Sequence, residues 1–252
     1  MQYIGKHSNV VQLLDCVYHF NSGDPDACSV YVPLATSSLG QLLGEYHFDL
    51  QAKLTLLVDY LKGLSYLNDE LQIMHRDINP NNLAITSFQS PRGIILDLDA
   101  ATTAKWSMDH MKGTVPYLAP EIVDLKKPPL GKEQEPYGKS VDIWALGLSA
   151  FEMYSGRRFH WAHFLPRGGT ISNVFTPEAY AAFHQKLVRY QETVQVTEEK
   201  SVIGLIRQMI DRDAPERISP SEGLAIALAL KTNDDEKGTI FRKKPPKRRL
   251  GA

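Results

Sequence analysis

The order of the predicted secondary structure elements constrains the fold of this chain most. Residues 10–15 and 29–34, rich in Val, Leu and Tyr, are separated by turn-forming residues and predict a β-hairpin. Two further short strands are expected over residues 83–85 and 93–96. After Gly138 the pattern is mainly helical, with helices expected over residues 140–154, 178–190, 200–211 and 220–230. A few strands followed by many helices predict an α+β fold with most of its mass helical.

Two of the expected helices begin with specific signals. Asp49 is expected to cap a long, core-facing helix, because apolar side chains after it recur with a period of 3.6 residues: Leu54, Leu57, Val58, Leu61 and Leu64. Ser219 and Glu222 form the pattern of a capping box, with proline at the first helical position. Loops are expected over residues 100–132 and over the Gly- and Pro-broken residues 166–177.

Composition excludes several classes of protein. A chain of 252 residues with 43% hydrophobic content can bury one large core or two modest ones. The formal net charge of −1 provides no overall field to attract nucleic acid or an anionic membrane, so neither partner is expected. The two cysteines, Cys16 and Cys28, are too few for a disulfide framework. With no secretory signal and no apolar run as long as a membrane span, we expect an intracellular protein.

One polar stretch carries the pattern of a catalytic loop. It contains His75, Arg76 and Asp77, followed after four residues by Asn82, which fits H-R-D-x-x-x-x-N. Taken alone, the motif leaves a simpler alternative open. In that alternative Asp77 caps a turn and His75 packs in the core.

Four further motifs follow in a fixed order. Asp97 comes directly after a predicted buried strand, and residues 113–121 end in Ala-Pro-Glu. Asp142 opens an apolar helix with the pattern D-x-W-x-x-G, and Arg217 lies just before the last capping box. In this order, over about 140 residues, the motifs resemble those of the eukaryotic protein kinase catalytic domain. The resemblance extends from His7 to Leu230 and implies a protein-kinase-like fold, with a truncated small β lobe and a complete helical large lobe.

The resemblance assigns roles to particular residues. Asp77 is expected to accept the proton of the attacking hydroxyl, and Asn82 and Asp97 to hold Mg²⁺ against the phosphates of ATP. Structural or regulatory roles are implied for His75, Arg76, Thr114, Glu121, Asp142 and Arg217, with Arg217 pairing with Glu121. Arg76 could also pair with a phosphate on one of the activation-segment hydroxyls Thr102, Thr103, Ser107 and Thr114, although any one of these could equally be an ordinary loop hydroxyl.

The same alignment places the adenine contacts and the domain boundaries. Val32 falls at the gatekeeper position, the Pro33 carbonyl and the Ala35 amide are the expected hydrogen-bonding groups, and Ala84 lies where the family has an apolar residue under adenine. Residues 1–35 are expected to be a remnant of the small lobe with its fourth and fifth strands and the hinge. Residues 36–230 correspond to the large lobe, and residues 231–252 to a basic, disordered tail.

The motifs also indicate a kinase class. The Ala-Pro-Glu segment and the D-x-W-x-x-G helix favour protein kinases over small-molecule kinases of the aminoglycoside type. Gly113 and Thr114, with Pro80 in the catalytic loop, look like the serine/threonine branch. The implied partners are ATP and a protein substrate or protein partner. The expected location is the cytoplasm, with the nucleus as an alternative if the basic tail is an import signal; the tail could also be a phosphate-seeking arm or, equally, a merely solvated end.

Departures from the family pattern leave two interpretations of function open. The glycine-rich loop, the third-strand lysine and the helix-C glutamate all belong before His7, and only six residues precede it. Asn79 stands where Ser/Thr kinases usually have lysine, and Asp99 replaces the glycine after the magnesium aspartate. Either the chain is a truncated or fragmentary Ser/Thr protein kinase, weak or inactive in this form, or it is a pseudokinase that acts as an interaction or regulatory module.

Overall fold

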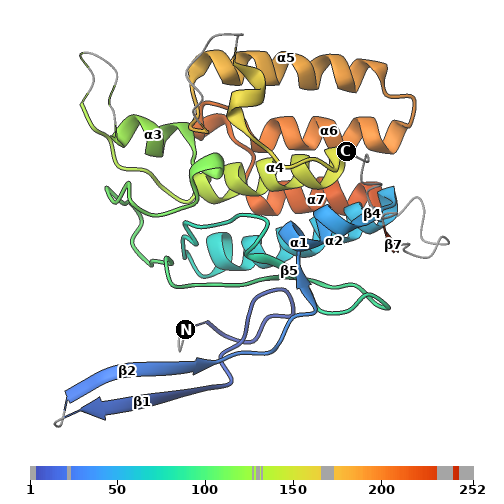
Figure 1. Cartoon of the computed structure of the whole chain (residues 1–252). Helices are drawn as coiled ribbons and strands as arrows, with labels where there is room; N and C mark the ends of the chain where they lie inside the picture. Colours follow the sequence, from blue (N-terminus) through green and yellow to red (C-terminus); the bar gives the residue numbers. More distant parts are fainter. Residues whose placement is uncertain are drawn as a thin grey trace, which may run out of the picture.

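The computed structural model describes residues 4–21, 24–126, 128, 131, 133–165, 173–231 and 241–243. A small β-rich part precedes a larger helical body, in the order that the sequence predicts (Figure 1). The expected α+β fold, protein-kinase-like with a reduced small lobe, is confirmed. None of the helices in these ranges has both the length and the apolar character needed to span a bilayer.

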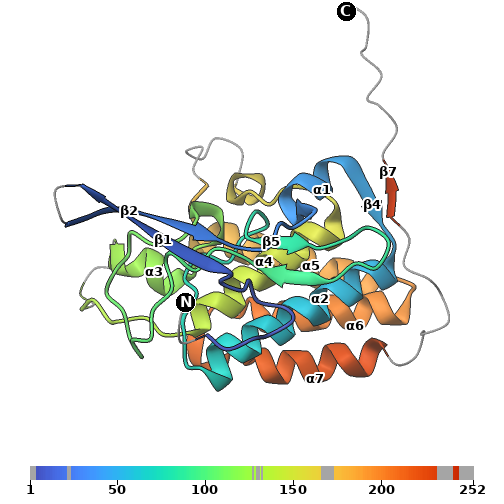
Figure 2. The same cartoon turned by 90° about the horizontal axis from the view of Figure 1, so that it is seen from below.

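The predicted hairpin is present, but its first strand begins and ends later than expected and its second strand begins and ends earlier. Strand β1 (Asp15–Asn21) pairs antiparallel with β2 (Asp24–Tyr31), and the register shifts between His19 and Phe20. The hairpin extends away from the helical body in both views (Figures 1 and 2). Val10 is not part of it, because its fully buried side chain belongs to the main core and its backbone bridges Ile95 instead.

A three-stranded sheet joins the linker after the hairpin to the helical body. Strand β3 (Ser37–Ser38) pairs with β5 (Leu83–Ile85), which pairs with β6 (Gly93–Ile95), both antiparallel. The last two strands were predicted from their apolar runs. Val10 forms an isolated bridge with Ile95 of β6, on the edge of β6 that does not pair with β5. This bridge attaches the start of the chain to the sheet.

Helix α4 (Ser140–Ser155) lies in the middle of the helical body, with 13 of its 16 residues buried. It contacts α2 (Leu50–Ser65) and α6 (Thr197–Met209), while α7 (Pro220–Lys231) packs on α2 and α6 (Figure 1). Gly147 permits the close approach of α4 to the end of α6, since a Cβ atom there would lie 2.7 Å from Ile210 Cγ2. The core is one continuous apolar cluster around these helices.

Both predicted helix caps are present. The Asp49 carboxylate accepts a hydrogen bond from Ala52 N at 2.7 Å. At α7, Glu222 N donates to Ser219 Oγ at 3.3 Å while Ser219 N donates to Glu222 Oε2 at 2.9 Å. The expected helices correspond to α2, α4, α6, α7 and α5 (Pro177–Thr193).

Several elements were not predicted from the sequence. They include β3, α1 (Leu39–Glu45), β4 (Tyr46–Phe48), the π-helical turn η1 (Tyr66–Glu70), the 3₁₀ turns η2 (Val115–Tyr117), η3 (Trp161–Phe164) and η4 (Ala214–Glu216), and α3 (Pro120–Lys126). Strand β7 (Phe241–Lys243) pairs with β4, so these three tail residues have regular structure, contrary to the expected disorder. The other residues beyond position 231 and much of the predicted loop over 166–177 lie outside the described ranges.

Candidate active site

Asp142 holds the backbone of the predicted catalytic loop in place. Its side chain, 1% exposed, accepts hydrogen bonds from His75 N at 2.7 Å and Arg76 N at 2.8 Å. Asn68 Nδ2 donates to the same carboxylate at 2.9 Å and to Ile73 O at 2.8 Å. A buried carboxylate whose lone pairs are filled by N–H donors is satisfied without a cationic partner. The first helical turn of α4 therefore fixes the start of the loop that carries Asp77.

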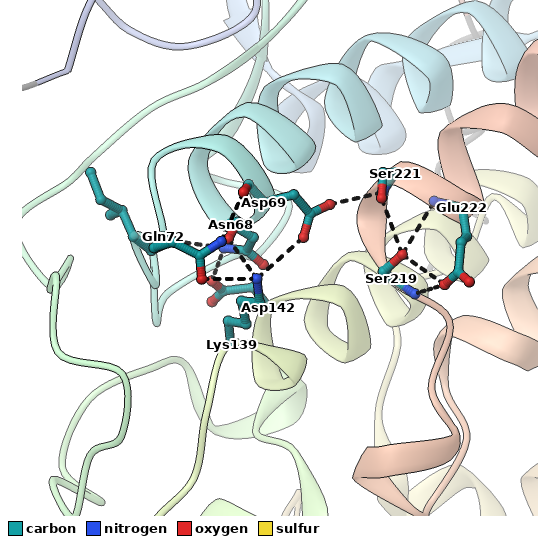
Figure 3. A network of polar contacts seen from close by, with 9 residues as sticks. Asn68, Asp69, Gln72, Lys139, Asp142, Ser219, Ser221 and Glu222 are labelled. Atoms are coloured by element: carbon teal, nitrogen blue, oxygen red, sulfur yellow. Dashed lines mark hydrogen bonds and ion pairs between the residues drawn. The ribbon is translucent and has the colours of Figure 1, made fainter.

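The network around Asp142 continues to the last helix (Figure 3). Lys139 Nζ donates to Asn68 O at 2.9 Å, to Gln72 Oε1 at 3.2 Å and to Asp69 Oδ1 at 3.5 Å. The other oxygen of Asp69 accepts a hydrogen bond from Ser221 N at 3.0 Å, in the first turn of α7. These contacts tie the ends of three helices, α2 with η1, α4 and α7, to the segment that precedes the catalytic loop.

The Asp77 carboxylate is the centre of a second hydrogen-bond network. One oxygen accepts from Thr114 Oγ1 at 2.7 Å and from Asn79 Nδ2 at 3.1 Å. The other accepts from Asn82 Nδ2 at 3.0 Å. Asn79 Nδ2 also lies 3.1 Å from Thr114 Oγ1, so the amide that replaces the family's lysine still links the loop to the activation segment. The carboxylate is oriented by neutral donors and is partly accessible to solvent.

Two hydrogen bonds connect the catalytic loop to the residue before Asp97. His75 is fully buried and its Nε2 lies 2.9 Å from Leu96 O, while Leu96 N donates to Asn82 O at 2.8 Å. Asp97 itself is exposed at the end of β6 and adopts a left-handed backbone with φ of +58°. Its carboxylate accepts from Asp99 N at 3.2 Å. The structure therefore brings the segment carrying Asp97 next to Asn82, 15 positions earlier in the chain.

The side chains at this point fit the ligand preference of Mg²⁺. Asn82 uses its amide nitrogen to bond Asp77, which leaves its amide oxygen as the potential ligand atom, and Asp97 offers a carboxylate. In the described ranges, no three His, Cys, Asp or Glu side chains group as a metal site. A magnesium ion held by one or two protein oxygens is usually completed by substrate phosphates and water. The pair Asn82 and Asp97 is consistent with that pattern.

Arg76 contacts the activation segment and has a strained backbone. Its φ is +67°, its Nε donates to Ala100 O at 2.6 Å, and its guanidinium lies 3.4 Å from Ser107 Oγ and 3.9 Å from Asp109 Oδ2. Of the four hydroxyl residues considered for phosphorylation, Ser107 is therefore the one beside Arg76. Residues outside the usual backbone regions concentrate at functional sites, and Arg76 and Asp97 both flank the candidate catalytic groups.

The predicted ion pair between Glu121 and Arg217 is present in the structure. Two guanidinium nitrogens lie 2.6 and 2.7 Å from the two carboxylate oxygens, and the Arg217 side chain is 0% exposed. The guanidinium also donates to the carbonyls of Asp211 and Ser140 and lies 5.0 Å from the centre of the Trp144 ring. The pair fastens α3, at the end of the activation segment, to α4 and to the loop before α7.

The residues predicted to contact adenine lie between the hairpin and the helical body. Val32 and Pro33 are exposed and Ala35 is partly buried, in the linker between β2 and β3. Thr36 N donates to Ile85 O at 2.8 Å, which ties the linker to the strand of Ala84. Ala84 is 0% exposed, so it offers no accessible surface of its own here. Adenine binding by this linker stays a prediction.

Sequence reasoning missed Asn68 as a site residue and treated Asn79 only as a departure. Asn68 directly follows Leu67 and is fully buried, and a buried asparagine is a signal that its amide has a specific partner. That partner, Asp142, is 74 positions away, so the sequence did not reveal it.

With the fold and the site described, the family can be assigned. Residues 1–228 match the family described as "Protein kinase domain". Because the match covers most of the 252 residues, the chain belongs to the protein kinase domain family.

Curated relatives agree with this assignment. The chain is 38% identical over 102 residues to human mitogen-activated protein kinase kinase kinase 5, covering 38% of this chain and 7% of that protein. It is 30% identical over 160 residues to human serine/threonine-protein kinase 32B, covering 62% of this chain and 34% of the relative. It is 27% identical over 206 residues to yeast serine/threonine-protein kinase KSP1, covering 76% of the chain and 18% of the relative. The chain thus matches only a minor part of these longer proteins.

Proposed function

We propose that this chain is the catalytic-domain part of a serine/threonine protein kinase, with ATP and Mg²⁺ as cofactors and hydroxyl side chains of proteins as substrates. Asp77 is the base that accepts the substrate hydroxyl's proton, and Asn82 and Asp97 are the residues that hold magnesium. Magnesium, when bound, would neutralise charge on the transferred phosphate. The proposal includes an intracellular location.

One observation carries the proposal: a single carboxylate, Asp77, is oriented by donors from two segments of the chain. Thr114 reaches it from the activation segment, while Asn79 and Asn82 reach it from the catalytic loop. A general base must be held within hydrogen-bond reach of the proton that it accepts. Asn82 makes this contact with its nitrogen, so the same side chain can orient the base and hold a metal through its oxygen.

The rate expected of the 252-residue chain by itself is low. Its sequence contains no glycine-rich phosphate loop and no strand-3 lysine paired with a helix-C glutamate. Losing one group that stabilises transition-state charge typically lowers the rate by about 10²- to 10³-fold. The neutral amide of Asn79 also supplies no positive charge where the family usually has lysine. Phosphate transfer by this chain is therefore expected at or near background.

A second function is that of a pseudokinase that acts as an interaction or regulatory module. It is favoured by the hydrogen bonds that the Asp77 carboxylate already accepts within the chain. The carboxylate accepts hydrogen bonds from Thr114, Asn79 and Asn82, which links loop and activation segment without a ligand. The same network could therefore serve to hold a binding surface rigid. Measurable transfer to a generic protein substrate that is lost in Asp77→Asn would count against this second function.

Nucleotide binding tests the proposed site directly, but it separates a kinase from a silent module only in part, because a pseudokinase can also bind ATP. Thermal melts are recorded with millimolar ATP and Mg²⁺ for the wild type, Asp97→Asn and Asn82→Ala. A ligand that binds only the folded state raises the melting temperature, so an upward shift is expected for the wild type and a smaller one for both variants. Asp124→Asn, which changes an exposed carboxylate on α3, should behave like the wild type.

The opposite pattern would reject the proposal. If the wild type shows no shift at millimolar nucleotide, or if Asp124→Asn loses the shift as much as Asp97→Asn, the candidate site does not bind magnesium and ATP as described.

A further inference from the structure

A pocket of about 640 Å³ lies away from Asp77, between the end of α4, the turn η3 and helices α5 and α6. Its inner surface is aromatic, and Phe183 of α5 is the common neighbour of the other rings. The Phe183 ring lies 4.9 Å from the ring of Phe151, 5.2 Å from that of Phe159 and 4.8 Å from that of Phe164, measured between centroids. Pockets of this size with apolar, aromatic linings are typical of ligand sites.

The residues around this pocket include four cations. Arg157 and Arg158 follow the end of α4, and Lys186 and Arg189 lie one turn apart on α5; all four are exposed. The described residues that line the pocket include no Asp or Glu. Of the carboxylates next to it, Glu152 is 1% exposed and lies 3.9 Å from Arg158, and Glu199 accepts a hydrogen bond from Tyr190 at 2.8 Å. In a chain with a net charge of −1, this is a local concentration of positive charge.

One contact joins the cations to the aromatic surface, and one buried polar group of the lining is left without a partner. Lys186 Nζ lies 5.4 Å from the centroid of the Phe164 ring, so a charge of the rim is directly beside the apolar lining. The Tyr154 side chain also lines the pocket, and its buried hydroxyl has no hydrogen-bond partner among the described residues. Buried polar groups are rarely left unpaired in native proteins.

We propose that this pocket docks a short acidic segment of a partner protein, with an aromatic side chain of that segment placed among the phenylalanine rings. The cations come from two separate segments of the chain. Arg157 and Arg158 lie between α4 and η3, and Lys186 and Arg189 lie on α5. An extended peptide with several carboxylates offers a negative charge to each set, whereas an isolated anion offers a single charge. Aromatic anchors in desolvated pockets and charge complementarity at the rim are the usual basis of such recognition.

Fluorescence anisotropy with a labelled peptide tests this proposal. The probe is a capped ten-residue peptide of Asp and Glu with one central Phe, titrated with the 252-residue chain. The pocket variant is Lys186→Glu/Arg189→Glu, whose side chains are exposed, so the helix is expected to fold. The control is Arg92→Glu/Lys126→Glu, which makes the same change of charge at two exposed cations outside the pocket. Thermal melts confirm that both variants are folded.

The proposal predicts saturable binding to the wild type and the control, and binding weaker by at least about tenfold in the pocket variant. A peptide with Ala in place of Phe should bind more weakly to the wild type. The proposal is overturned if the wild type does not bind at millimolar concentrations, if the control loses binding equally, or if the Ala peptide binds as well. Stronger binding of a single-stranded oligothymidylate of equal charge would also overturn it, because the site would then select phosphate backbones.

Discussion

Replacing Asp142 should destabilise the whole domain, because its carboxylate is the acceptor for the buried backbone at the start of the catalytic loop. Asp142→Ala removes the acceptor for His75 N and Arg76 N, both within 2.8 Å of it, and for the side-chain amide of Asn68. A buried donor left without a partner costs about 1–3 kcal/mol, so the free energy of unfolding should fall by about 3–5 kcal/mol. That is a large part of the stability of an ordinary domain.

The variant Asp142→Asn separates the contribution of the side chain's size and shape from that of its negative charge. The asparagine keeps the size of the side chain but presents an NH₂ group on one side, where it faces a backbone or amide donor. The expected loss is about 1–3 kcal/mol, smaller than for alanine. Urea unfolding followed by tryptophan fluorescence measures both variants, since Trp144 lies in the same helical turns and is fully buried. Asp213→Asn, at an exposed position, is the control.

Asp142 would not be the essential acceptor for this loop if the free energy of unfolding of Asp142→Ala were within about 1 kcal/mol of the wild-type value. The result would also contradict this role if Asp142→Asn lost as much free energy of unfolding as Asp142→Ala. The remaining oxygen and the shape of the side chain would then contribute nothing to stability.

Three further predictions follow from buried contacts. Gly147→Ala should lower the free energy of unfolding by about 1–3 kcal/mol in the same urea assay, because its Cβ would lie 2.7 Å from Ile210 Cγ2; an unchanged midpoint would show that α4 and α6 can move apart freely. Arg217→Lys should cost about 2–4 kcal/mol, since lysine cannot reproduce the two-pronged contact with Glu121; wild-type stability would contradict this. Burial raises the pKa of the Glu152 carboxyl, so the wild type loses stability as pH rises through that pKa, whereas Glu152→Gln does not titrate. The stability of Glu152→Gln relative to the wild type should therefore increase as the pH rises above the ordinary carboxyl range, and a difference independent of pH would contradict the raised pKa.

Local signals in the sequence were sufficient for much of the fold. Asp49 and the Ser219 to Glu222 box placed two helix starts, because a cap depends on residues only three positions apart. The start of α1 had the same kind of signal, a capping box between Ser38 and Gln41, which was not recognised. Pro120 followed by Glu121 likewise marks the start of α3, within a segment expected to be a loop.

Contacts between distant segments could not be predicted in the same way. The bond of Asn68 to Asp142 and that of Thr114 to Asp77 join residues 74 and 37 positions apart, and no spacing rule relates them. The pairing of Glu121 with Arg217 was anticipated only because the motifs resemble those of a family. Strand β7 was missed because a three-residue strand depends on its partner β4 and not on its own composition.

Paramagnetic broadening with Mn²⁺ and ATP tests most directly whether Asp97 and Asn82 form one metal and nucleotide site beside Asp77. In amide NMR spectra of the 252-residue chain, we expect Mn²⁺ with ATP to broaden the signals of Asn82 and Asp97 and of their neighbours, and to leave those of α6 unchanged. In Asp97→Asn this broadening should be much weaker. Signals that stay sharp around both residues, or that broaden only elsewhere in the domain, would contradict the assignment of this site.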